Sequence, residues 1–306
     1  MRIGIGLDTD GPLDATIERA TTLRRAGFTS MWSSQIFGPD TLTVLALVGR
    51  ELRDVDLGTA VVPIQPRHPT MLAAQARTVQ EAIGGRLSLG VGLSHQRIVE
   101  GMWGLSFERP ASYMAEYVEA LAPLLRGEIV SYKGERLRAV TVGPLGPKDV
   151  RTPNLLIAAL GPAMLKLAGT MTDGTLLWMT GRKTIESHVV PRIREAAAAA
   201  GRDAPRVVCS LPVTMSEDLA GARDRVNETF AVYATLPSYA AMMEREGAAT
   251  PAEVALLGSK EQIFEQLGLL AAAGVTEFSA VVNGTRDERD ATLGLLSGIA
   301  TSGVAP

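Results

Sequence analysis

Among the side chains of this sequence, His95 is the one best suited to proton chemistry near neutral pH. It is one of only three histidines and follows the apolar run Arg86–Ser94, where a buried strand would end. An imidazole there could act as a general acid or donate a hydrogen bond to a cofactor or substrate. It could equally serve only to hold the next loop in place. Of the other two, we predict that His68 starts a helix and that His188, inside a predicted helix, lies on the surface.

A second candidate site is the segment Leu160–Met164, where an apolar run gives way to a predicted helix. Free backbone N–H groups and the helix dipole at such a junction can bind a phosphate, and Gly161 permits close approach. Pro162 removes one donor, and a plain Gly-Pro helix start is the alternative. Arg182 could bind an anionic substrate or cofactor tail, or be a solvated surface residue.

Three further residues have a functional and a structural interpretation. Trp103 and Trp178 could stack on a ring, although core packing is the commoner role of tryptophan. Cys209 lies within an apolar run and is expected to pack in the core. As the only cysteine it can form no intramolecular disulfide, which favours a cytoplasmic location.

Several classes of function are excluded by what the sequence lacks. The histidines are scattered without metal-ligand spacing, and neither a P-loop nor G-x-S-x-G occurs, so we predict no metal site. Lysine and arginine total 30 against 33 acidic residues, and this balance gives no field that would attract nucleic acid or a membrane surface. No signal peptide and no membrane-spanning run are apparent, so we expect small-molecule partners.

These residues must be positioned by a regular alternation of short apolar runs and longer segments with helical periodicity. That alternation predicts βα units and a parallel sheet. The eight predicted strands are residues 2–8, 28–35, 55–62, 86–94, 154–160, 175–179, 207–215 and 276–282. Eight such units predict a single TIM-barrel domain, (β/α)₈, over residues 1–306.

The predicted barrel carries three additions. Insertions follow strands four and seven, and a β-hairpin within residues 128–152 precedes strand five. A doubly wound open sheet is the alternative fold, but no G-x-G-x-x-G supports it. Because the active site of a barrel lies at the C-terminal ends of its strands, the polar residues that follow the strands become candidates. They are Asp8, Ser33, Ser34, Gln35, Ser94, His95, Gln96, Gly161, Thr180 and Arg182.

Four segments resemble the bacterial-luciferase-like flavin and deazaflavin oxidoreductases in order and spacing. They are Leu57–Pro63, Arg67–Pro69, Gly85–Gly92 and Ala158–Pro162. The likeness extends over nearly the whole chain and is closest to actinobacterial members that depend on coenzyme F420. It implies a cofactor ring resting against a bulge in strand three, with a cis peptide at Ala60–Val61.

The resemblance also implies roles for individual residues. A phosphate-bearing tail would pass the loops after strands four and five. Where sugar-phosphate-oxidising relatives have an acidic glutamate this chain has His95, and where they have an Asp-His pair it has Gln35-Ile36. Arg182 aligns with their phosphate-binding lysine. The predicted cofactor-binding residues are Gln35, Ala60, Val61, Ser94, His95, Gln96, Leu160, Gly161, Pro162, Ala163 and Met164. We predict His95 as catalytic, and Asp8 and Arg182 as substrate-binding.

The function that follows from the resemblance is hydride transfer between coenzyme F420 and a small organic substrate. Two alternatives are an FMN-dependent monooxygenase and a protein that binds the cofactor without turnover. Family habit further predicts a homodimer.

Overall fold

Eight parallel strands form a closed ring in the computed structural model, which describes residues 1–35 and 37–302. Neighbouring strands follow one another along the chain, and the last pairs with the first. In order around the ring they are β1 (Arg2–Gly6), β2 (Ser30–Ser33), β3 (Asp56–Thr59), β5 (Leu87–Gly92), β8 (Asn154–Ala158), β9 (Gly174–Trp178), β10 (Arg206–Met215) and β12 (Glu277–Val282). The predicted TIM barrel is therefore confirmed.

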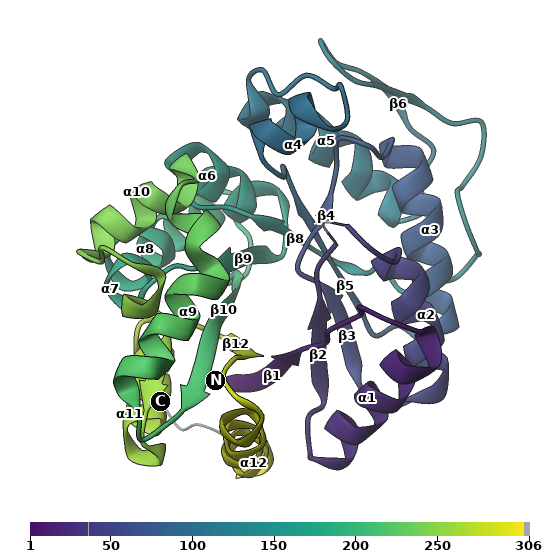
Figure 1. The fold of residues 1–306 in the computed structure, drawn as a ribbon. Helices are drawn as coiled ribbons and strands as arrows, with labels where there is room; N and C mark the ends of the chain where they lie inside the picture. The colour runs from purple at the N-terminus through teal and green to yellow at the C-terminus, as the bar shows by residue number, and fades with distance from the viewer. Residues whose placement is uncertain (36, 303–306) are drawn as a thin grey trace.

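Helices surround the ring, as Figure 1 shows. They are α1 (Leu13–Arg25), α2 (Thr41–Glu51), α3 (Pro69–Ala82), α5 (Pro110–Leu125), α6 (Pro162–Met171), α8 (Val190–Ala199), α11 (Lys260–Ala272) and α12 (Arg286–Ser302). Local sequence sets where several begin. The Asp40 carboxylate accepts a hydrogen bond from the Thr43 N–H at the start of α2, and Ser259 forms a capping box with Gln262 at the start of α11. His68 caps α3, as its predicted structural role requires.

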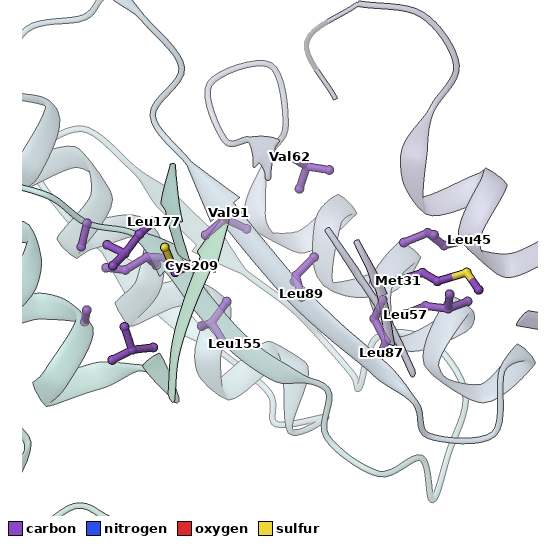
Figure 2. Close-up of a cluster of buried hydrophobic side chains, with 14 of the residues drawn as sticks. Met31, Leu45, Leu57, Val62, Leu87, Leu89, Val91, Leu155, Leu177 and Cys209 are labelled. Atoms are coloured by element: carbon purple, nitrogen blue, oxygen red, sulfur yellow. The ribbon is translucent and has the colours of Figure 1, made fainter. Parts of the chain in front are cut away.

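The main core lies between the ring and the helices. Alternate residues of each strand point outward, which places Leu57, Leu89, Leu155 and Cys209 in this layer (Figure 2). A smaller cluster fills the interior of the ring and is made of Trp32, Leu156, Leu176 and Val208. The cysteine is fully buried, so its predicted packing role is confirmed.

Glycine makes room for the large interior side chain. Trp32 on β2 is paired in register with Gly58 on β3. A Cβ atom at position 58 would lie 2.3 Å from two ring atoms of Trp32, so only glycine fits beside the indole. The same indole donates a hydrogen bond to buried Glu277, which also bonds Arg206 and Ser30 near the amino ends of the strands. That end of the barrel is held together by polar groups bonded to one another.

The three predicted additions are present. The loop after β5 contains the short helix α4 (Gln96–Gly101), and strands β6 (Ser131–Lys133) and β7 (Arg138–Val140) form the antiparallel hairpin before β8. The insertion after β10 contains α9 (Leu219–Ala234), α10 (Pro237–Glu246), the 3-10 turn η2 (Pro251–Glu253) and β11 (Leu256–Gly258). Strand β11, which pairs with β10 outside the ring, was not predicted because it is only three residues long.

One local prediction was wrong, and one strand is divided. Strand three is interrupted where the resemblance placed a bulge, since β3 stops at Thr59 and the short strand β4 (Val62–Pro63) follows after a break. His188 is buried with 1% of its surface exposed, although we predicted a surface position. It lies in a π-helical turn, η1 (Ile185–Val189), between α7 (Arg182–Thr184) and α8. Pro191 has no N–H to continue regular helical bonding, and the wider turn before it changes which way the side chain points.

Candidate active site

The C-terminal ends of the parallel strands gather the predicted site residues at one end of the barrel. Asp8 follows β1, Gln35 follows β2, His95 follows β5, Leu160 follows β8 and Arg182 follows β9. In Figure 1 this end lies toward the top, where α4, α6 and α10 are labelled, and α11 and α12 lie toward the bottom. The chain order therefore brings residues far apart in sequence to a common edge.

Small residues floor this end of the barrel. Ala60 and Val61 pack against the interior cluster and remain partly exposed. Gly6 and Ala158 alternate with outward-facing core residues, so they face the interior, and both are partly exposed as well. Large apolar side chains therefore fill the middle of the ring, and the residues above them on β1, on β8 and at the break in strand three are small. Such a surface suits a flat ring better than a bulky group.

The peptide bond between Ala60 and Val61 is cis, as the family resemblance predicted. The N–H of Ala60 donates to the carbonyl of Ser33 at 2.7 Å, and the N–H of Gln35 donates to the carbonyl of Val61 at 3.1 Å. These two bonds join the break in strand three to the end of β2.

Two non-glycine residues at the same edge have left-handed backbone conformations. Ser94, after β5, has φ of 57°, and Met179, directly after β9, has φ of 50°. Such conformations cost free energy and concentrate at ligand-binding and catalytic sites. They turn the chain sharply where the loops leave the barrel.

His95 lies partly buried at the start of α4, with its ring nitrogens available. Neither nitrogen has a hydrogen-bond partner among residues 1–35 and 37–302. Its ring packs beside Tyr239 of α10, with centroids 5.9 Å apart. Burial lowers the pKa of His95 from its ordinary value, because the charged form loses solvation. The imidazole is therefore neutral at pH 7 and offers one N–H donor and one nitrogen acceptor.

An aromatic wall extends from His95 along the insertion after β10. Tyr239 contacts Tyr233 edge-on at 5.2 Å between centroids, and Tyr233 and Phe230 each contact Trp178 at 5.5 and 5.4 Å. Trp178 was a candidate for stacking on a ring, whereas the three aromatic residues of α9 and α10 were not predicted. The available signal was local enrichment, since Phe230, Tyr233 and Tyr239 fall within ten residues of a chain that is only 5% aromatic. This wall shields one side of the His95 ring from water.

The N-terminus of α6 opens onto the same edge without a side-chain cap. Gly161 is the N-cap residue and Pro162 occupies the first helical position. The first hydrogen bond of the helix runs from the Leu165 N–H to the Gly161 carbonyl. The N–H groups of Ala163 and Met164 have no partner within the described part of the chain. A Cβ atom at Gly161 would meet no described atom within 4 Å. This junction therefore offers free donors and open space.

The side chain of the predicted site residue Gln35 is held by hydrogen bonds to its neighbours. The Gln35 side-chain oxygen accepts from Arg67 at 2.9 Å and from the Thr41 N–H at 3.2 Å. Gln35 and Arg67 line a hollow of about 390 Å³. Trp103 also lines this hollow and does not pack in the core. Ile36 lies outside the described residues, so its predicted position is not described.

Three of the predicted polar site residues bond neighbours that are close to them in sequence. The Gln96 amide donates to Glu100 at 2.8 Å, one turn along α4. The Arg182 guanidinium binds Glu186 at 2.7 Å. Asp8 is exposed, and its side chain accepts from the N–H of Asp10 at 2.9 Å. Their predicted roles in substrate or cofactor binding remain predictions.

Residues 1–35 and 37–302 contain no cluster of three or more histidine, cysteine or acidic side chains arranged for a metal ion. Within the same residues, no helix has both the length and the apolar character needed to cross a bilayer.

Comparison with known proteins agrees with this architecture. The model of the luciferase-like monooxygenase family matches residues 1–277. The chain therefore belongs to that family. A 5,10-methylenetetrahydromethanopterin reductase of Archaeoglobus fulgidus is 30% identical over 227 residues, covering 72% of this chain and 66% of the relative. A putative coenzyme F420-dependent oxidoreductase of Mycobacterium tuberculosis is 29% identical over 195 residues, covering 58% and 55% of the two chains.

A solved structure shows the same fold over nearly the full length. The coenzyme F420-dependent tetrahydromethanopterin reductase from Methanopyrus kandleri superposes with a TM-score of 0.80 at 22% identity. The match covers 97% of each chain. The additions to the barrel therefore do not disturb its frame.

Proposed function

We propose that this protein is an oxidoreductase that uses coenzyme F420 and transfers a hydride to or from a small organic substrate. Family membership and the F420-dependent relative of M. tuberculosis support this choice of cofactor. The observation that carries the proposal is the uncapped N-terminus of α6, which lies at the same barrel end as the apolar floor and His95.

The residues present fit such a cofactor. Coenzyme F420 combines a flat deazaflavin ring with a phosphodiester-bearing tail. The backbone N–H groups of Ala163 and Met164, with the positive end of the helix dipole, would bind the phosphate. Gly6, Ala60, Val61 and Ala158 would accept the ring, since none projects a large side chain into that space.

The protein then contributes orientation, shielding and a hydrogen-bonding group, and the bound deazaflavin supplies the carbon that gives or takes the hydride. The apolar floor and the aromatic wall exclude water from the reacting centre. His95 would hold the substrate oxygen through its neutral N–H and steady the charge that develops there. Because its pKa is lowered, His95 acts as a neutral hydrogen-bond donor rather than as an imidazolium acid.

The experiment that tests this function is a turnover assay with reduced F420 and a panel of carbonyl, imine and enone acceptors. We expect oxidation of F420 that requires both protein and acceptor. Oxidation that depends on FMN and oxygen would favour the monooxygenase alternative. Tight cofactor binding without turnover of any acceptor, in either direction, would favour the non-enzymatic carrier.

We also propose a cytoplasmic homodimer, from family habit and from the single buried cysteine. Light scattering at working concentration tests the oligomeric state, and a monomer would contradict it.

A further inference from the structure

His188 is buried directly behind the loop that the proposed function assigns to the cofactor phosphate. Its Nε2 lies 2.8 Å from the carbonyl oxygen of Leu160, the second residue after the end of β8. The side chain is 1% exposed, and its Nδ1 is buried without a partner in the described structure. Burying an imidazole with only one of its two nitrogens bonded costs free energy. That cost points to a role for the single hydrogen bond that the ring makes.

The chemistry of this contact fixes the state of the ring. A carbonyl oxygen only accepts, so Nε2 must carry the proton, and Nδ1 must be the bare nitrogen of a neutral imidazole. A proton on Nδ1 would be buried without an acceptor. Burial lowers the pKa of His188, and the nearby cations Arg192 of α8 and Arg245 of α10 lower it further against the opposing effect of the Leu160 carbonyl.

The bond also fixes the orientation of the next peptide group. In a trans peptide, the C=O of Leu160 and the N–H of Gly161 point in opposite directions. With the carbonyl held toward His188, the Gly161 N–H points away from the helix that carries the histidine. That N–H donates no hydrogen bond within residues 1–35 and 37–302, and it precedes the free N–H groups of Ala163 and Met164.

We propose that His188 is a positioning residue for the anion-binding loop. By holding the Leu160 carbonyl, it orients the Gly161 N–H so that three backbone donors of residues 161–164 can face one phosphate. The inference rests on the proposed function, because it assigns that phosphate to the cofactor. It also gives the π-helical turn a role, because this turn after β9 carries the imidazole that contacts the loop.

Three variants separate positioning from packing. His188→Gln keeps a side-chain N–H at a reach similar to Nε2, His188→Asn keeps the amide on a shorter stem, and His188→Leu removes the donor. We expect His188→Leu and His188→Asn to weaken F420 binding about tenfold, as the loss of one orienting hydrogen bond would, and His188→Gln to stay within about threefold of wild type. The kcat at saturating cofactor should change little, because His188 touches neither ring nor substrate.

A matched control comes from His68, which also bonds a backbone carbonyl, that of Arg138, through Nε2. His68→Asn should leave F420 affinity unchanged. Binding is measured by fluorescence titration of each folded variant. If His188→Leu fails to fold, the contrast between His188→Asn and His188→Gln decides. Equal affinities for those two variants and wild type would overturn the proposal.

Hydrogen exchange in the unliganded protein tests the same positioning without any cofactor. The Leu165 N–H bonds the Gly161 carbonyl at 2.9 Å and closes the first turn of α6. If His188 holds the loop that starts this turn, the Leu165 amide should exchange faster in His188→Asn than in His188→Gln, and equal rates in both would overturn the proposal. If wild type binds no F420 while this exchange contrast holds, the assignment of the cofactor fails and the positioning of the loop stands.

Discussion

A glutamate placed at position 163 should fill the anion site with the protein's own charge. Ala163 is exposed at the second position of α6 and its N–H is free. A carboxylate there would interact favourably with the helix dipole, and we expect the free energy of unfolding to rise by about 0.3–1 kcal/mol. Stability and cofactor affinity should therefore change in opposite directions.

The loss of affinity follows from charge repulsion. Two like charges about 5 Å apart repel by about 1 kcal/mol in bulk water and about 3 kcal/mol at the effective dielectric of a protein surface. Because this site is open on one side, Ala163→Glu should weaken F420 binding by about 5- to 150-fold. The penalty should shrink as salt is added.

The assay is a fluorescence titration of F420 at low and high ionic strength, with urea denaturation of the same preparations. Ala163→Gln is the matched control, since it has nearly the same size without the charge, and it should bind within about threefold of wild type. Undiminished F420 binding by folded Ala163→Glu would refute the assignment of the phosphate to this helix.

Three other predictions follow from the same structure. His95→Ala should lower kcat about 10²- to 10³-fold, as the loss of one hydrogen-bond donor to a developing charge would, and leave F420 affinity within about threefold. A lower melting temperature with normal turnover would instead show a structural histidine. Gly58→Ala should lower the free energy of unfolding, measured by urea denaturation, by about 1–3 kcal/mol because its methyl group would overlap Trp32. The control Gly268→Ala, whose methyl group would meet no described atom, should raise it by about 0.5–1 kcal/mol. Acidification below about pH 6.5 should destabilise the protein, because the pKa values of His95 and His188 are lowered in the folded chain and the unfolded chain therefore binds more protons. Urea midpoints at about pH 7 and about pH 5.5 should differ less in His188→Gln.

The barrel could be predicted from sequence because its determinants are local and repeated. Each strand is a short apolar run and each helix has its own period and end signals, such as Gly27 after α1 and His68-Pro69 before α3. The order of the units then implies a ring, since consecutive parallel strands lie side by side. The cis peptide at Ala60–Val61 was predicted by resemblance, because no local rule distinguishes it from an ordinary bond.

The site was predicted less completely because its remaining parts depend on contacts distant in sequence. His95 was found by its place after a strand, but its neighbour Tyr239 comes from an insertion whose docking position no pattern specifies. His188 was predicted at the surface because helical periodicity does not reveal the π-helical turn η1, which turns its side chain inward. The pairing of Arg182 with Glu186 depends on which way the side chain turns from the loop, and sequence spacing alone does not decide between solvent, ligand and neighbour.

The proposed function is tested most directly by titrating the wild-type protein with F420 and, side by side, with FMN, and by following cofactor fluorescence and calorimetry. We expect saturable binding of F420 at a stoichiometry of one per chain, tighter than that of FMN, and weakened by Ala163→Glu. Micromolar binding of FMN with no detectable binding of F420 would contradict it.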